Sequence, residues 1–153
     1  MRTLFFVLLV VLSAFPVLAQ SDDLTKYFQK YPFDSVDGET FWQNRNVQEV
    51  VRRSVSSKFL QEMLLDAGST TAPIDGVGGY MQAWACEQHN CGDHNWVVAI
   101  KNDGSKGAVC YFNKDLSNGA RWFVNAQKVF DAPFGQCETG RLPRSVLRSL
   151  SEL

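Results

Sequence analysis

The spacing of apolar residues changes from helical to alternating partway along the chain. From Asn46 onward, apolar residues recur every three or four positions, which predicts an amphipathic helix that ends at Gly68. Asn46, with Glu49 three residues later, is typical of a capped helix start. The apolar stripe comprises Val47, Val50, Val51, Val55, Phe59, Met63 and Leu64. We expect this stripe to cover one face of a sheet.

Beyond a linker rich in Gly, Ser, Thr and Pro (68–79), the apolar period becomes two. Alternation of this kind is typical of strands, and the predicted strands are 80–86, 96–100, 108–112 and 121–124. Asn102-Asp103-Gly104 and Asn118-Gly119 provide turn residues between them. Four strands joined by short turns predict an antiparallel meander.

The flanking segments are predicted to be helical or to cover the sheet. Residues 22–44 carry six aromatics, for which we expect a short helix followed by a segment packed on the domain. Asn125 is predicted to cap a short helix that reaches Phe130. A last amphipathic helix is predicted over 143–153, beside a basic patch of Arg141, Arg144 and Arg148. The predicted fold class is α+β: a twisted antiparallel β-sheet (meander) with helices packed on it.

The first 19 residues have a positive start at Arg2, an apolar middle and small residues before position 20, which predicts a secretory signal peptide. Residues 20–153 are then expected to form a single secreted domain, with no later membrane-spanning segment. The whole chain holds 15 basic and 16 acidic residues, and losing Arg2 brings the net charge to about −2. This charge argues against a nucleic-acid partner held by bulk positive charge.

Four cysteines lie after the leader: Cys86, Cys91, Cys110 and Cys137. An even count in a secreted chain predicts disulfides, and of the three pairings we favour Cys86–Cys91 with Cys110–Cys137. The first pair closes a six-residue ring between the first and second predicted strands, with His89 near its middle. We expect this ring to project from the end of the sheet.

Common catalytic motifs are missing from the sequence, which contains no G-x-S-x-G elbow, no H-E-x-x-H helix and no Gly-rich phosphate loop. An alternative is a metal-binding or thiol-redox protein that uses Cys86, His89, Cys91 and His94, since two sulfurs and two nitrogens suit zinc in number. The spacing differs from paired zinc knuckles, and C-x4-C is not the redox C-x-x-C motif. We therefore expect no cofactor.

The segment Cys86-x-x-His89-x-Cys91-Gly92 resembles the loop signature of the inhibitor of vertebrate lysozyme (Ivy) family. The order of predicted elements is similar from about Asn46 to Asp131. The resemblance implies a non-enzymatic, periplasmic inhibitor of c-type lysozyme that protects the bacterial cell wall. It also implies endogenous lytic transglycosylases as further partners.

By the same resemblance, the disulfide-closed ring enters the enzyme's cleft, and His89 meets the catalytic carboxyl pair. The implied partner-binding residues are Glu87, Gln88, His89, Asn90 and Gly92. The family's best-known ring reads Cys-Lys-Pro-His-Asp-Cys, so this chain differs at positions 87, 88 and 90.

Overall fold

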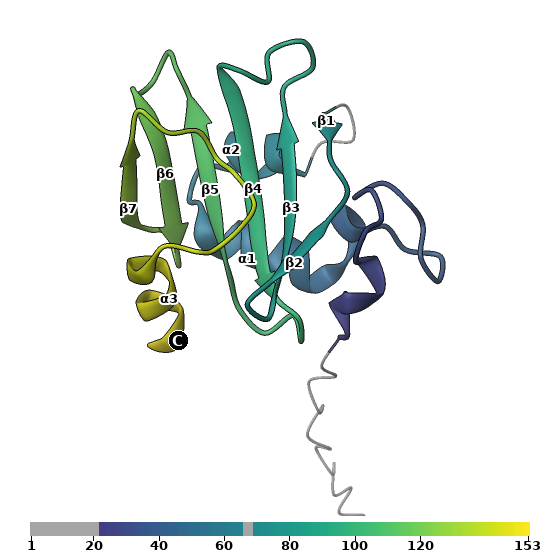
Figure 1. Cartoon of the computed structure of the whole chain (residues 1–153). Coiled ribbons are helices and arrows are strands. Elements are labelled where there is room, and N and C mark those ends of the chain that lie inside the picture. The colour runs from purple at the N-terminus through teal and green to yellow at the C-terminus, as the bar shows by residue number, and fades with distance from the viewer. Residues whose placement is uncertain (1–21, 66–68) are drawn as a thin grey trace, which may run out of the picture.

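The fold is built on a seven-stranded antiparallel sheet with helices on both faces (Figure 1). The computed structural model describes residues 22–65 and 69–153, so the predicted signal peptide lies outside the described residues. The strand order is β1-β3-β4-β5-β6-β7, and β2 also pairs with β3. The strands are β1 (Thr70–Thr71), β2 (Asp75–Val77), β3 (Tyr80–Cys86), β4 (His94–Lys101), β5 (Gly107–Asn113), β6 (Gly119–Val124) and β7 (Gln127–Pro133). The α+β class is thereby confirmed.

The central strands confirm the four predicted from alternation, with small shifts at their ends. β3 pairs with β4 without a bulge, from Tyr80 opposite Lys101 to Cys86 opposite Asn95. Seven of the eight residues of β4 are buried, because both faces of the sheet are covered here. Trp96, Val98 and Ile100 face one core, whereas Val97 and Ala99 face the other.

The long helix predicted to run from Asn46 to Gly68 is wrong as a single element. The structure has α1 (Arg45–Ser54) and α2 (Lys58–Leu64), separated by a short extended segment. Asn44, not Asn46, caps α1, because its side-chain oxygen accepts hydrogen bonds from the amides of Asn46 and Val47. Ser57 caps α2 through the amide of Leu60. The break turns Phe59 out of the apolar stripe and leaves it 77% exposed.

The helix predicted from Asn125 to Phe130 is also wrong, since this segment forms most of edge strand β7. Asn125 and Ala126 both have positive φ (48° and 60°), the conformation of a two-residue hairpin turn. The predicted linker likewise contains two short strands, β1 and β2, which pair with β3.

The two faces of the sheet carry separate cores. α1 and α2 cover one face, while α3 (Arg144–Ser151) and the segment before it cover the other (Figure 1). α3 confirms the predicted C-terminal helix and buries Val146 and Leu150. Cys137 in the preceding segment forms a disulfide with Cys110 of β5. Among the described residues, no helix is long and apolar enough to span a bilayer.

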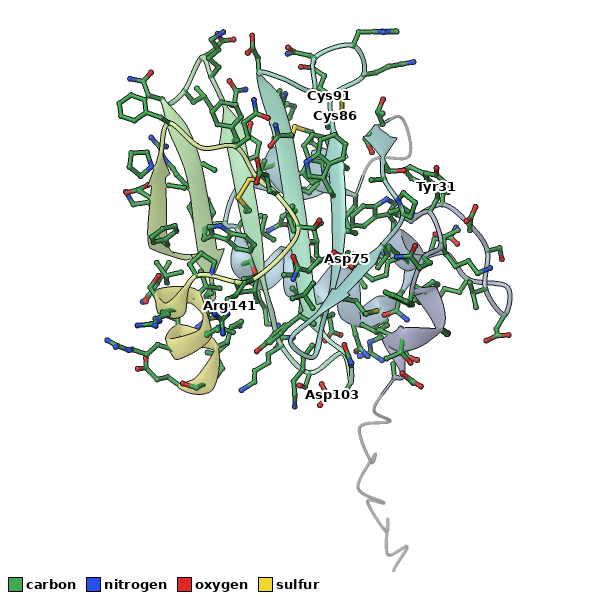
Figure 2. The ribbon with its side chains drawn as sticks, viewed as in Figure 1. Tyr31, Asp75, Cys86, Cys91, Asp103 and Arg141 are labelled. Atoms are coloured by element: carbon green, nitrogen blue, oxygen red, sulfur yellow. A yellow bond between two sulfur atoms is a disulfide. The ribbon has the colours of Figure 1, made fainter. Side chains whose placement is uncertain are left out.

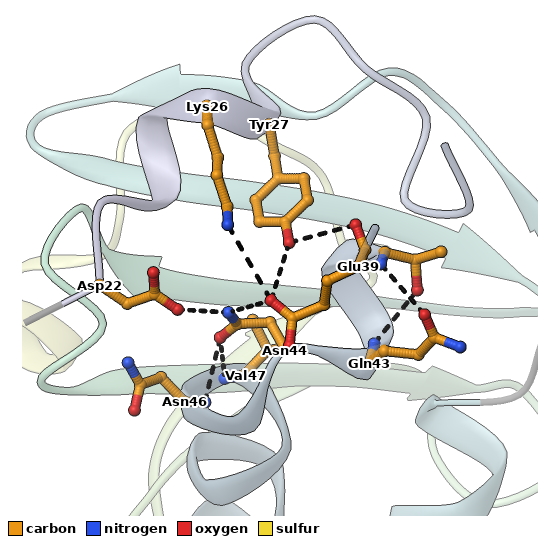
Figure 3. A network of polar contacts seen from close by, with 9 residues as sticks. Asp22, Lys26, Tyr27, Glu39, Gln43, Asn44, Asn46 and Val47 are labelled. Atoms are coloured by element: carbon orange, nitrogen blue, oxygen red, sulfur yellow. Dashed lines mark hydrogen bonds and ion pairs between the residues drawn. The ribbon is translucent and has the colours of Figure 1, made fainter. Parts of the chain in front are cut away.

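The N-terminal segment is attached to α1 by a polar network (Figure 3). The side-chain nitrogen Nδ2 of Asn44 donates hydrogen bonds to the carboxylates of Asp22 and Glu39, and the Tyr27 hydroxyl also donates to Glu39. Burial, with Glu39 nearby, raises the pKa of Tyr27. The network thus joins the 3₁₀ helix Leu24–Tyr27 to the start of α1 and closes one core.

Candidate partner-binding site

The connection from β3 to β4 is a short ring that extends beyond the end of the sheet (Figure 1). The predicted Cys86–Cys91 disulfide is present, with the two Cα atoms 4.9 Å apart (Figure 2). The amide of Asn90 donates to the Glu87 carbonyl at 3.0 Å, and the amide of His94 donates to the Asn90 carbonyl at 2.9 Å. The amide of Glu87 closes the neck by donating to the His94 carbonyl at 3.1 Å. The ring is therefore ordered by one covalent bond and several backbone hydrogen bonds.

The predicted partner-binding residues Glu87, Gln88, His89, Asn90 and Gly92 are all exposed. His89 has φ of 65°, in the left-handed region that histidine adopts more readily than most non-glycine residues. It occupies the third position of the turn that the Asn90–Glu87 hydrogen bond closes. The structure thus gathers the candidate residues on one small exposed loop.

Glu87 is involved in contacts within the molecule as well as being exposed. Its Oε2 atom accepts a hydrogen bond from the Asn90 side chain at 2.7 Å and lies 3.1 Å from Nδ1 of His94. These hydrogen bonds hold the pKa of the Glu87 carboxyl below its usual 4.5, and the bond from Asn90 has the larger effect on the pKa. The Glu87 side chain therefore orders the ring, a role that the sequence resemblance did not suggest.

His94 is buried beneath the ring and connects it to β5. Its Nε2 atom lies 3.0 Å from the Tyr111 hydroxyl, while Nδ1 faces the Glu87 carboxylate. An ionised carboxylate can only accept, so Nδ1 donates to Glu87, while Nε2 is paired with the Tyr111 hydroxyl, which can donate or accept. Both ring nitrogens of His94 are therefore bonded within the protein.

In this arrangement the two ring cysteines are not available as zinc ligands. Cys86 and Cys91 are joined to each other, so neither supplies a thiolate ligand. Within the described part of the chain, no group of three or more His, Cys, Asp or Glu side chains is placed to hold a metal ion.

The base of the ring is fixed by Asn95, a residue that the sequence analysis did not single out. Its fully buried side chain donates to the Cys91 carbonyl at 2.8 Å and to Gln136 at 3.2 Å, and accepts from the Cys137 amide at 3.0 Å. Gln136 in turn donates to the Gly92 carbonyl at 2.7 Å. The Cys110–Cys137 disulfide therefore holds a segment that supports the ring. The sequence signal that could have identified Asn95 is a polar residue among the apolar positions of a buried strand.

Together, these features define a class of protein: a disulfide-stabilised α+β domain with one ordered, exposed loop at the end of its sheet. The family model described as inhibitor of vertebrate lysozyme (Ivy) matches residues 46–114, so the resemblance to this family is confirmed for that segment. The match spans α1, α2, β1 to β5 and the ring, slightly less than half of the chain. No curated protein and no solved structure matches the chain.

The family match has three general consequences. It supports a role as a lysozyme inhibitor and implies lysozyme as a protein partner. An inhibitor family is also consistent with a function that involves no catalysis. With the two disulfides, the match suggests a location outside the cytoplasm.

Proposed function

We propose that this protein inhibits c-type lysozyme by inserting the Cys86–Cys91 ring into the enzyme's active-site cleft, with His89 at the leading end. The observation that carries the proposal is an ordered, exposed loop bearing a single imidazole at its turn. The place of action would be the periplasm, after removal of a leader over residues 1–19, and the benefit would be protection of the cell wall.

The chemistry of the target suits an imidazole. Retaining glycosidases hold two carboxyl groups about 5–5.5 Å apart, one protonated and one ionised. Imidazole presents a nitrogen on each side, so His89 can hydrogen-bond both carboxyls and exclude substrate. Hydrogen bonds to charged groups contribute about 1.5–3 kcal/mol each.

The order of the ring lowers the entropic cost of insertion. Immobilising a flexible side chain on binding costs about 0.5–1.5 kcal/mol, and ordering backbone costs more. Here the disulfide and the Asn90–Glu87 and His94–Asn90 hydrogen bonds already fix the loop before binding. The support from Asn95 and Gln136 fixes the loop relative to the sheet.

The direct test is the inhibition constant of the protein against a c-type lysozyme, with His89→Ala as the variant. We expect a loss of about 2 kcal/mol, or roughly 30-fold weaker inhibition, as for a central hot-spot residue. His89→Gly distinguishes loss of the imidazole from an effect on the backbone, because glycine adopts the φ of 65° without strain. Inhibition by either variant at the level of the unmodified protein would show that the imidazole is not the inhibitory group.

The same assay with a lytic transglycosylase tests the other partner that the family resemblance implies. If the protein inhibits only the transglycosylase, and His89→Ala abolishes this, the ring keeps its role and the target changes. If it inhibits neither enzyme, the proposed function is wrong.

A further inference from the structure

We propose that the partner-binding surface extends from the ring into a groove beside it, where Phe59 and Leu116 contact the enzyme that takes up the ring. The inference rests on the proposed function and specifies the partner's chemistry: an apolar side chain flanked by basic ones at the rim of its cleft.

The groove has a volume of about 680 Å³ and lies between the ring, α2 and the turn from β5 to β6. Glu87 and Gln88 line it from the ring, Phe59 and Met63 from α2, and Leu116 from the turn. Tyr111, which is bonded to His94, also lines it. Asn90 is a third ring residue in its wall, so an enzyme that encloses His89 from this side also covers the groove.

Exposed apolar side chains gather at this end of the molecule. Among the described residues, the three most exposed large apolar side chains are Phe134 (89%), Phe59 (77%) and Leu116 (65%). Phe59 and Leu116 line the groove, and the amide of Phe134 donates to Asn118 in the same turn as Leu116. Single exposed apolar residues are ordinary, but two that line one groove beside a candidate binding loop are typical of an interaction surface.

The size of a stable interface supports the same conclusion. A specific complex buries about 800 Å² on each partner, supplied by roughly 20–30 residues. A ring whose sequence separation is five residues cannot provide that area alone. The groove adjoins the ring and combines concave shape with exposed apolar side chains, the features of an interface core.

The charges near the groove favour a basic partner. Glu87, Asp93 and Asp115 are exposed at this end, and the nearby Lys114 forms an ion pair with Asp93 at 3.1 Å. Glu87 and Asp115 both line the groove. Acidic groups around an apolar patch accelerate association with a basic surface and select against acidic proteins.

The test compares Phe59→Ala and Leu116→Ala with Leu153→Ala in lysozyme inhibition. Leu153 is a matched control because it is a leucine of similar exposure (63%) that lines a different pocket with Lys106 and Asn125, away from the ring. We expect each groove variant to inhibit about fivefold more weakly and Leu153→Ala to change inhibition by less than twofold. All three side chains are exposed, so thermal unfolding should confirm an unchanged fold.

The outcomes separate this inference from the proposed function. If the unmodified protein inhibits lysozyme and His89→Ala weakens it, but both groove variants stay within twofold, the groove proposal is overturned alone. If the unmodified protein neither binds nor inhibits lysozyme, the proposed function fails and this inference fails with it. If the groove variants weaken lysozyme inhibition and Leu153→Ala does not, the extended surface is supported.

Discussion

Replacing Asn95 with alanine should destabilise the protein and loosen the ring from the sheet. The substitution removes the acceptor of the Cys137 amide and the donor to the Cys91 carbonyl. Cys137 is 1% exposed, so its amide cannot easily bond water instead. An unsatisfied buried polar group costs about 1–3 kcal/mol. With a smaller contribution from the half-buried Cys91 carbonyl, we expect a loss of about 2–4 kcal/mol in the free energy of unfolding.

The measurement is urea unfolding of the disulfide-intact protein, analysed by linear extrapolation. Asn118→Ala is the control, because Asn118 is exposed and should change stability by less than about 0.5 kcal/mol. Amide exchange at Glu87 and Asn90 should rise in Asn95→Ala, since the ring loses its support. A loss below about 1 kcal/mol, with unchanged exchange in the ring, would refute the assignment of Asn95 as the support.

Three further predictions concern the ring. Gln88→Pro should tighten lysozyme inhibition about two- to fivefold, because proline suits the second turn position and restricts the unbound loop; equal or weaker inhibition would contradict this. Glu87 has a lowered pKa, so its ionised form stabilises the folded ring above about pH 4.5, and this stabilisation is lost as the pH falls through the lowered value. Glu87→Gln should therefore remove this pH dependence from the amide NMR shifts of Asn90. Opening the ring with Cys86→Ala and Cys91→Ala should weaken inhibition at least about tenfold while unfolding remains cooperative; normal inhibition would exclude preordering as the cause.

The strands were predictable because their signal is local. Alternation and short turns located β3, β4, β5 and β6 to within two residues at their ends. β7 was missed because Asn125 can cap a helix or occupy a left-handed turn, and only pairing with β6 distinguishes the two. The break between α1 and α2 was missed because the apolar spacing continues through Val55, which is buried in extended conformation.

The ring and its disulfide were predictable from cysteine spacing, but its supports were not. Asn95 binds Cys137 across 42 positions in the sequence, and Gln136 binds Gly92 across 44. Such contacts depend on the path of the C-terminal segment over the sheet, which no local pattern encodes. Phe59 illustrates the converse: its periodicity predicted burial, yet the helix break leaves it beside the groove.

The location of Cys137 bears on which part of the chain is an autonomous folding unit. The family match ends at residue 114, but Cys110 within it is bonded to a cysteine beyond it. Leu24, Tyr27 and Phe41 complete one core from before the match, and Val146 and Leu150 complete the other from after it. A fragment trimmed to 46–114 would expose apolar surface on both sides and carry a reactive thiol. Its expected behaviour is aggregation, so the smallest useful recombinant form retains both flanks.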